Sequence, residues 1–164
     1  VYNIDSVHYR PVSFRRRKLV GRLMRLEPVA PNNLHDHWDS VEEDLRGCLK
    51  HDTSGAWIED VYAMIQNGAA FLYILRGNND EHMGALVIER TVNRWNGDVG
   101  IHVWMCCNRA GHQILREGQG LLEEIALQAG AKKITFRSDK LSFERLCRDL
   151  GYQLNEIELV KELS

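Results

Sequence analysis

Apolar residues recur at helical spacing in two segments of the chain. Between Leu34 and Leu49 an apolar side chain follows every three or four residues, so these side chains fall on one face of a helix. The same spacing recurs over about 56–66 and ends at the pair Asn67-Gly68. The pattern therefore predicts two amphipathic helices, of which the first is capped by Asn32 or Asn33.

Short apolar runs bounded by turn residues predict strands before and after these helices. The turn compositions Gly77-Asn78-Asn79-Asp80 and Trp95-Asn96-Gly97 separate three such runs, which indicates two consecutive hairpins. Helical spacing returns twice later in the chain, each time before a glycine stop, Gly130 or Gly151. The predicted strands cover 22–29, 70–75, 83–91, 98–106, 132–137 and 152–163, and the two later helices cover 113–128 and 141–150.

The order of these elements is (β)ααβββαβαβ, which defines an α/β fold. A strand, a helix and a further strand beside the first imply a right-handed crossover with the two strands parallel. Because the hairpins make other neighbours antiparallel, the predicted sheet is mixed. We assign residues 1–30 to a basic N-terminal arm with the first strand, and residues 31–164 to the folded domain.

The composition is that of one ordinary globular domain. The chain has 164 residues, of which 44% are hydrophobic and 27% charged, and such values exclude a disordered chain or a disulfide miniprotein. No apolar run approaches the roughly 18 to 20 residues that a membrane span needs, and the first residues lack the apolar stretch of a signal peptide. We therefore expect a soluble, cytoplasmic protein without a membrane span.

The cysteines do not form a metal-binding pattern. Cys48, Cys106, Cys107 and Cys147 contain no C-x-x-C pair, and no histidine lies near them at zinc-finger spacing. The triplet His35-Asp36-His37 resembles a metal-binding motif, but residues two apart lie on different faces of a helix. We expect reduced thiols and no metal site.

The charge of the chain is unevenly distributed. Residues 1–27 have a local charge of +5 and the remainder has −7, for a net charge of −2. A basic arm on an acidic body is typical of proteins that contact nucleic acid or an acidic partner. The alternative is an arm that folds against its own acidic domain. The candidate contact residues are Arg10, Arg15, Arg16, Arg17, Lys18, Arg22 and Arg25.

Two stretches near the end of the chain carry a family resemblance. The sequence Gly130-Ala131-Lys132-Lys133-Ile134-Thr135, followed after a short helix by Leu150-Gly151-Tyr152, resembles the GCN5-related N-acetyltransferase (GNAT) superfamily. The element order agrees, and the resemblance covers roughly residues 69–163. It implies the acyl-CoA N-acyltransferase fold and, in active members, transfer of an acetyl group from acetyl-CoA to an amine.

The acetyl-CoA loop of that superfamily is altered in this chain. Active members have a loop of the form Arg/Gln-x-x-Gly-x-Gly/Ala, whose backbone N–H groups and following helix N-terminus hold the pyrophosphate. Here only Gly111 survives, and Gln113 and Leu115 replace two glycines. The resemblance implies cofactor contacts from Met105, Cys106, Arg109, Gly111, His112 and Gln113.

The catalytic positions of the superfamily also differ. Where many members place a tyrosine that protonates the departing thiolate, this chain has Cys147, and its place on an apolar helix face favours a core thiol over an acid. A general base on the central strands could be Glu89, Asp98 or His102, each of which is also an ordinary polar strand residue. Catalysis and binding without catalysis therefore both stay open.

The segments Leu34-x-x-x-Trp38, Ile58-Glu59-Asp60-Val61 and Phe136-Arg137-Ser138-Asp139 resemble acetyltransferase-like proteins of bacteriophages, some of which are associated with head assembly. Together with the altered loop, this resemblance implies a non-catalytic binding or structural protein without a cofactor. Its partners would be other protein subunits, including virion proteins, or DNA held by the basic arm, in the host cytoplasm or the virion. The alternative is an active N-acetyltransferase that uses acetyl-CoA.

Overall fold

The computed structural model describes residues 24–52, 54–109, 111, 115–137 and 147–155. Except for the 3-10 helix η1, which was not predicted, each helix and strand within these residues has the type that the sequence pattern predicts, with ends that differ by at most two residues. In chain order they are β1 (Met24–Val29), the short 3-10 helix η1 (Pro31–Asn33), α1 (Leu34–Leu49), α2 (Ile58–Gln66), β2 (Ala70–Gly77), β3 (His82–Val92), β4 (Val99–Asn108), α3 (Leu115–Gln128) and β5 (Lys133–Phe136).

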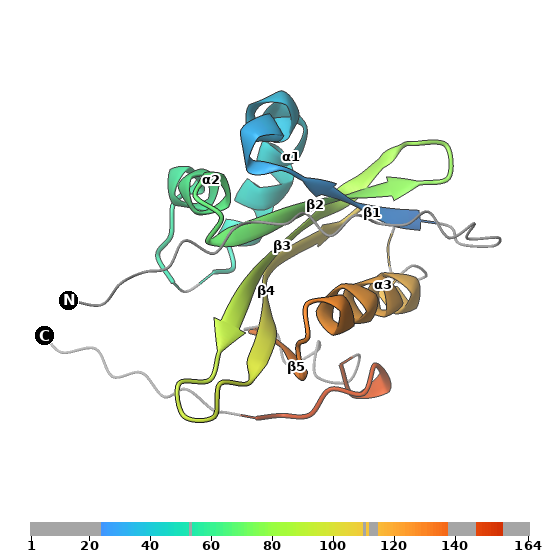
Figure 1. Cartoon of the computed structure of the whole chain (residues 1–164). Coiled ribbons are helices and arrows are strands. Elements are labelled where there is room, and N and C mark those ends of the chain that lie inside the picture. Colours follow the sequence, from blue (N-terminus) through green and yellow to red (C-terminus); the bar gives the residue numbers. More distant parts are fainter. Residues whose placement is uncertain (1–23, 53, 110, 112–114, 138–146, 156–164) are drawn as a thin grey trace, which may run out of the picture.

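The five strands form one mixed sheet in the order β1-β2-β3-β4-β5. Strands β1 to β4 pair antiparallel, and β5 pairs parallel with β4 after the crossover through α3. Figure 1 shows α1 and α2 on one face of this sheet and α3 on the other. The predicted mixed α/β architecture is therefore confirmed.

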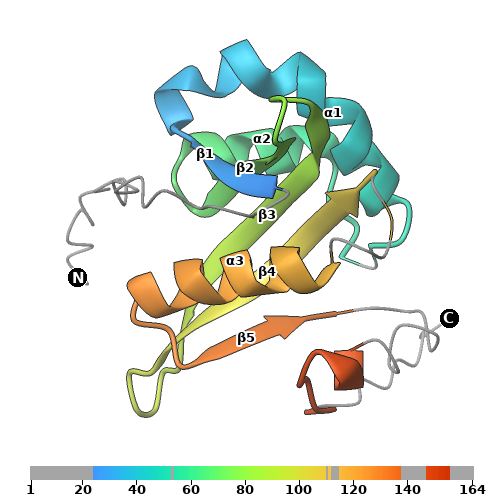
Figure 2. The same ribbon diagram turned by 90° about the vertical axis from the view of Figure 1, so that its right-hand side faces the viewer.

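Each face of the sheet has its own apolar core, because successive strand residues point to opposite sides. On β2, Leu72 and Ile74 pack under α1 and α2 together with Val41 and Leu45. The alternate residue Leu75 packs on the opposite face with residues of α3. Figure 2, turned by 90°, shows α3 lying across the sheet.

The N-termini of α1 and α2 differ in their capping. Asn33 occupies the N-cap position of α1, but its side chain makes no capping hydrogen bond, so the expected asparagine cap is absent. At α2 the Asp60 carboxylate accepts a hydrogen bond from the Trp57 backbone N–H at 2.8 Å. An acidic group in the first turn also complements the positive end of the helix dipole.

Several predicted segments lie outside the described residues. They include most of the basic arm and the first part of the helix predicted over 141–150, of which residues 147–149 are helical. Residues 152–155 are irregular, so the described start of the predicted closing strand is not a strand. Of the arm's candidate contact residues only Arg25 is described, and it forms an ion pair with Asp80. Among the described helices, none is long and apolar enough to cross a membrane.

We predict opposite effects on stability for two glycine substitutions. Gly84 has φ +147°, and a Cβ there would overlap the carbonyl oxygen of Cys107 on β4, so Gly84→Ala should destabilise the protein by more than about 2 kcal/mol. Gly120 lies in α3 with open space around its Cα, so Gly120→Ala should stabilise the protein by up to about 1 kcal/mol. Urea unfolding of both variants measures the difference, and a Gly84→Ala protein as stable as wild type would contradict the packing of β3 on β4.

Candidate functional site

Strands β4 and β5 pair over only four positions and then part. Their register runs from Gly100 opposite Lys133 to Val103 opposite Phe136, whereas β4 continues to Asn108. The β3–β4 register shifts at the same place, so that Trp104 is an extra residue on β4. A bulge of this kind bends a strand and turns its side chains. The edge of β4 beyond Val103 thus has no ladder partner among the described strands.

Two of the predicted catalytic residues meet beside this parting. Glu89 on β3 lies directly opposite His102 on β4. His102 Nδ1 lies 3.0 Å from the hydroxyl oxygen of Thr135, its register partner on β5. Burial lowers the pKa of His102 below its usual 6.5, although the nearby Glu89 carboxylate acts in the opposite direction. The imidazole is therefore mostly neutral at pH 7.

An ionised carboxylate lies on the same side of the sheet. Asp52, in the loop between α1 and α2, accepts hydrogen bonds from the Ser54 backbone N–H at 3.0 Å and from Trp104 Nε1 at 3.2 Å. Burial would raise the pKa of Asp52, but these bonds and the positive charge of Arg137 outweigh it and lower the pKa. Asp52 also contributes to the electrostatic environment of His102. The parting is thus bordered by a neutral base and an anion.

The opposite side of the parting carries a tyrosine. The Tyr152 ring packs edge-on against Phe136, with 5.0 Å between ring centroids. Its hydroxyl donates a hydrogen bond to Gln119 Oε1 at 3.0 Å, and burial raises its pKa. Cys147, the predicted thiolate-protonating residue, is buried, and its carbonyl oxygen accepts the Tyr152 N–H at 2.9 Å. Burial raises the pKa of Cys147, so it stays a neutral thiol.

Arg109, the first residue after β4, forms an ion pair with a buried aspartate of α1. Arg109 Nη2 lies 2.7 Å from Asp44 Oδ1 on α1, and Arg109 Nε donates to the same oxygen at 2.9 Å. The second carboxylate oxygen of Asp44 lies 2.7 Å from His82 Nε2 at the start of β3. Asp44 is only 6% exposed. This Asp44 cluster, made of Asp44, His82, Arg109 and the nearby Cys107, ties α1 to the ends of β3 and β4.

The remaining predicted cofactor contacts are placed as follows. Met105 is buried in the core under α1 and α2, and Cys106 is exposed. Gly111 has φ +79°, a backbone conformation that favours glycine, and its carbonyl oxygen accepts the Asn108 side-chain N–H at 2.9 Å. His112 and Gln113 lie outside the described residues. Asp98, the third candidate base, is ion-paired with Lys132 at 2.7 Å.

Thr135, Asp52 and Asp44 were not predicted from the sequence. Thr135 reaches His102 only through the parallel register of β4 and β5, and nothing in a spacing of 33 residues reveals such a pairing. Asp52 follows the end of α1 in a turn composition, where an aspartate is an ordinary residue. Asp44 falls on the buried side of α1. An acidic residue at a position where the helix pattern expects an apolar one was the signal that could have identified it. Among the described residues no group of histidine, cysteine and acidic side chains could hold a metal ion.

The mixed sheet with helices on both faces has the fold of the GNAT acyl-CoA N-acyltransferases. No protein-family model and no curated sequence matches this chain, whereas solved acetyltransferases do match its structure. A ribosomal-protein-alanine N-acetyltransferase from Brucella melitensis biovar Abortus 2308 has a TM-score of 0.63 at 12% identity, covering 87% of this chain and 100% of that one.

Two further acetyltransferases are similar in structure. An aminoglycoside acetyltransferase from an uncultured soil metagenomic sample, in complex with sisomicin, has a TM-score of 0.62 at 11% identity, with coverage of 87% and 97%. An acetyltransferase of Trypanosoma brucei has a TM-score of 0.57 at 14% identity, with coverage of 85% and 99%. At such low identity the likeness establishes the fold, and the fold is the GNAT fold.

We predict that Asp44→Asn destabilises the protein by about 1 to 3 kcal/mol near pH 7, because it removes the buried anion that Arg109 and His82 share. Burial raises the pKa of Asp44, but hydrogen bonds from His82, Arg109 and Cys107 outweigh it and lower the pKa below 3.8. The unfolded chain therefore takes up this proton first, and stability is lost as the pH falls below about 4.

Urea unfolding between pH 7 and pH 3 measures this effect, and Asp44→Asn should lose less stability over the acid range than wild type. The control is Glu43→Gln, which removes an exposed carboxylate from the same helix and should stay within about 0.5 kcal/mol of wild type. If Asp44→Asn and wild type show the same acid dependence, the Asp44 cluster does not hold the charge as described.

Proposed function

We propose that this protein transfers an acyl group from an acyl-CoA to a primary amine, with His102 as the general base. The observation that carries the proposal is the position of His102, a mostly neutral imidazole oriented by Thr135 at the point where β4 and β5 part. When Nδ1 holds the ring proton and donates it to Thr135 Oγ1, Nε2 has the lone pair that a base needs. The structural likeness to acetyltransferases supports the same chemistry.

The chain's residues have distinct tasks in this reaction. His102 takes the proton that the amine nitrogen loses as it bonds to the thioester carbonyl carbon, and the carbon–sulfur bond breaks. Tyr152 or Cys147, on the other side of the parting, supplies the proton that the departing thiolate takes up. Asp52 and Glu89 favour an acceptor that arrives as a cation, because both carboxylates contribute to the electrostatics at His102. Such an ammonium group first releases one proton to water, and His102 takes the second proton as the neutral amine attacks.

The residues present fit an acyl-CoA only in part. The edge of β4 at 104–107, which pairs with no described strand on the side of β5, offers backbone groups, and Gly111 keeps the positive φ of a tight loop. Two glycine positions of the loop hold Gln113 and Leu115, and Leu115 is the first residue of α3. Losing two hydrogen bonds to a charged group would weaken binding by roughly two to four orders of magnitude. We therefore propose that the donor binds weakly.

A second candidate function is binding without catalysis. The altered glycine positions favour it, and so does the Asp44 cluster, in which the predicted phosphate ligand Arg109 is held by a protein carboxylate. In this case the GNAT fold is a scaffold for other protein subunits, including virion proteins, or for DNA bound by the basic arm. The two candidates differ in whether an acyl-CoA binds at all.

We predict that His102→Gln lowers the rate of acyl transfer by about 10²- to 10⁴-fold, because it removes the base and keeps a polar side chain of similar size. The wild-type rate should fall on the acid side with an apparent pKa below 6.5, since only neutral His102 accepts a proton. Release of free CoA thiol, followed against a panel of primary amines from pH 5 to pH 9, measures both. A His102→Gln enzyme with the wild-type rate and the same acid limb would exclude His102 as the base.

We further predict that acetyl-CoA binds wild type weakly and that the double variant Gln113→Gly, Leu115→Gly binds it at least tenfold more tightly, because backbone N–H groups regain access to the pyrophosphate. Calorimetric titration into the millimolar range measures both affinities. Gly118→Ala, which lies three residues further along α3 in ordinary van der Waals contact, is the matched control and should leave the affinity unchanged. No heat with either protein would favour binding without catalysis.

A further inference from the structure

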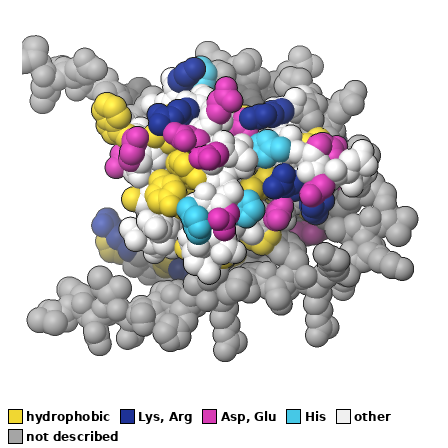
Figure 3. All heavy atoms as spheres, turned by 90° about the horizontal axis from the view of Figure 1, so that it is seen from above, with side chains coloured by type: hydrophobic (Ala, Val, Ile, Leu, Met, Phe, Trp, Pro, Cys, Tyr) yellow, Lys and Arg dark blue, Asp and Glu magenta, His cyan; other side chains and the backbone are white. Residues whose placement is uncertain are grey.

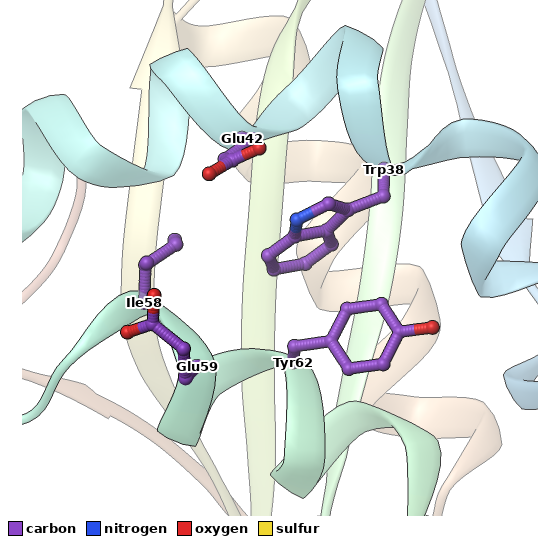
Figure 4. A pocket seen from close by; sticks show the side chains of 5 residues that line it. All are labelled: Trp38, Glu42, Ile58, Glu59 and Tyr62. Carbon is purple, nitrogen blue, oxygen red and sulfur yellow. The ribbon is translucent and has the colours of Figure 1, made fainter.

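A cavity of about 150 Å³ lies between α1 and α2, apart from the parting of β4 and β5. Its lining combines two aromatic rings, two carboxylates and one aliphatic side chain, namely Trp38, Glu42, Ile58, Glu59 and Tyr62. Figure 4 shows the Glu42 and Glu59 carboxylates on one side of the cavity and the Trp38 indole on the other. None of these residues takes part in the proposed acyl transfer.

The aromatic wall of the cavity is packed against the apolar core. Trp38 and Tyr62 meet edge to face with 4.7 Å between their ring centroids, and both pack against the core under α1 and α2. Ile58 is buried with 4% exposure. An aromatic face that is preorganised in this way attracts a cation within about 6 Å, best of all when the ring is an indole.

The carboxylates of the cavity already attract a cation of the chain itself. Arg46 donates to Glu42 Oε1 from Nε at 2.9 Å and from Nη2 at 2.7 Å, and its Nη2 lies 3.8 Å from Glu59 Oε1. One cation faces two anions, so the cavity keeps a net negative charge. The Glu59 contact is long and 74% of its side chain is exposed, which leaves this carboxylate available to a second cation.

The helices that border the cavity carry more acidic than basic side chains. Besides Glu42 and Glu59, they have the exposed residues Asp36, Asp39, Glu43 and Asp60, against the exposed Arg46. Figure 3, seen from above, shows acidic and basic side chains mixed on this face. An excess of one sign raises the local concentration of oppositely charged ligands.

The size of the cavity limits what it can hold. Sites for cofactors and drug-sized ligands measure roughly 300 to 1,000 Å³, whereas about 150 Å³ holds a single benzene-sized group. A charged head group on a short alkyl chain fits both this volume and the aliphatic floor at Ile58. We propose that the cavity binds a primary alkylammonium group, with the charge between Glu42 and Glu59 and the alkyl chain against Trp38.

The probe for this site is n-butylammonium chloride, with neutral n-butanol as the matched control ligand. Titration of each into the full chain is followed by the NMR signal of the Trp38 indole N–H, assigned with Trp38→Phe. We expect a saturable shift with n-butylammonium and none with n-butanol. An equal response to both ligands, or a response that does not saturate, would overturn the proposal.

Two substitutions should change the affinity in opposite directions. Glu59→Gln removes the exposed carboxylate and should weaken n-butylammonium binding at least fivefold, whereas Arg46→Gln removes the competing cation and should tighten it several-fold. Glu43→Gln, which removes an equal charge from the same face without lining the cavity, should change the affinity less than twofold. If all three variants bind like wild type, the cavity is not the site.

A third ligand distinguishes the source of the ammonium group. A capped Gly-Lys-Gly peptide that binds more tightly than n-butylammonium would identify a lysine side chain of a partner protein. Equal or weaker binding of the peptide would identify a free amine. The Trp38 signal reports on the cavity, whereas release of free CoA thiol reports on acyl transfer, so failure of either is measured separately.

Discussion

The end of the β4–β5 pairing at Val103 is the constraint on which the rest of the site depends. As long as two strands are paired, their backbone groups bond to each other, and no ligand can reach them. Beyond Val103 the extra residue Trp104 bends β4 away from β5, and His102 is held at the last part of the ladder by Thr135. The same short ladder therefore leaves an edge of β4 without a partner among the described strands, and it orients His102, the proposed base, beside that edge.

The Asp44 cluster fixes the other end of this edge. Burying a carboxylate costs several kcal/mol unless hydrogen bonds and opposite charge offset it, and Asp44 obtains both from Arg109 and His82. This ion pair also affects ligand binding, because an Arg109 that neutralises Asp44 is less available to a phosphate. The cluster thus gives a physical reason for the weak donor binding that we propose, and it leaves the GNAT fold itself intact.

The sequence was sufficient for the fold, because the order of elements follows from local periodicity and turn residues such as Gly97 and Gly130. The family resemblance also singled out Glu89, Asp98 and His102 as candidate bases on the central strands. The sequence could not show that Glu89 and His102 lie opposite each other, nor that Thr135 contacts His102, because register is a property of pairing between distant segments. Arg109 is an example of the opposite kind, where the sequence suggested a role that the structure makes less simple. Its charge predicted a contact with phosphate, but only the structure shows that it pairs with the buried Asp44.

The two proposed ligand sites both have carboxylates, which would favour a cation. Asp52 and Glu89 act at the parting of β4 and β5, and Glu42 and Glu59 act at the cavity between α1 and α2. This preference does not depend on the glycines of the altered loop, because the carboxylates lie on other elements. An amine acceptor would therefore be attracted even where the acyl donor binds weakly, and a binding protein that had lost catalysis would still be selective for amines.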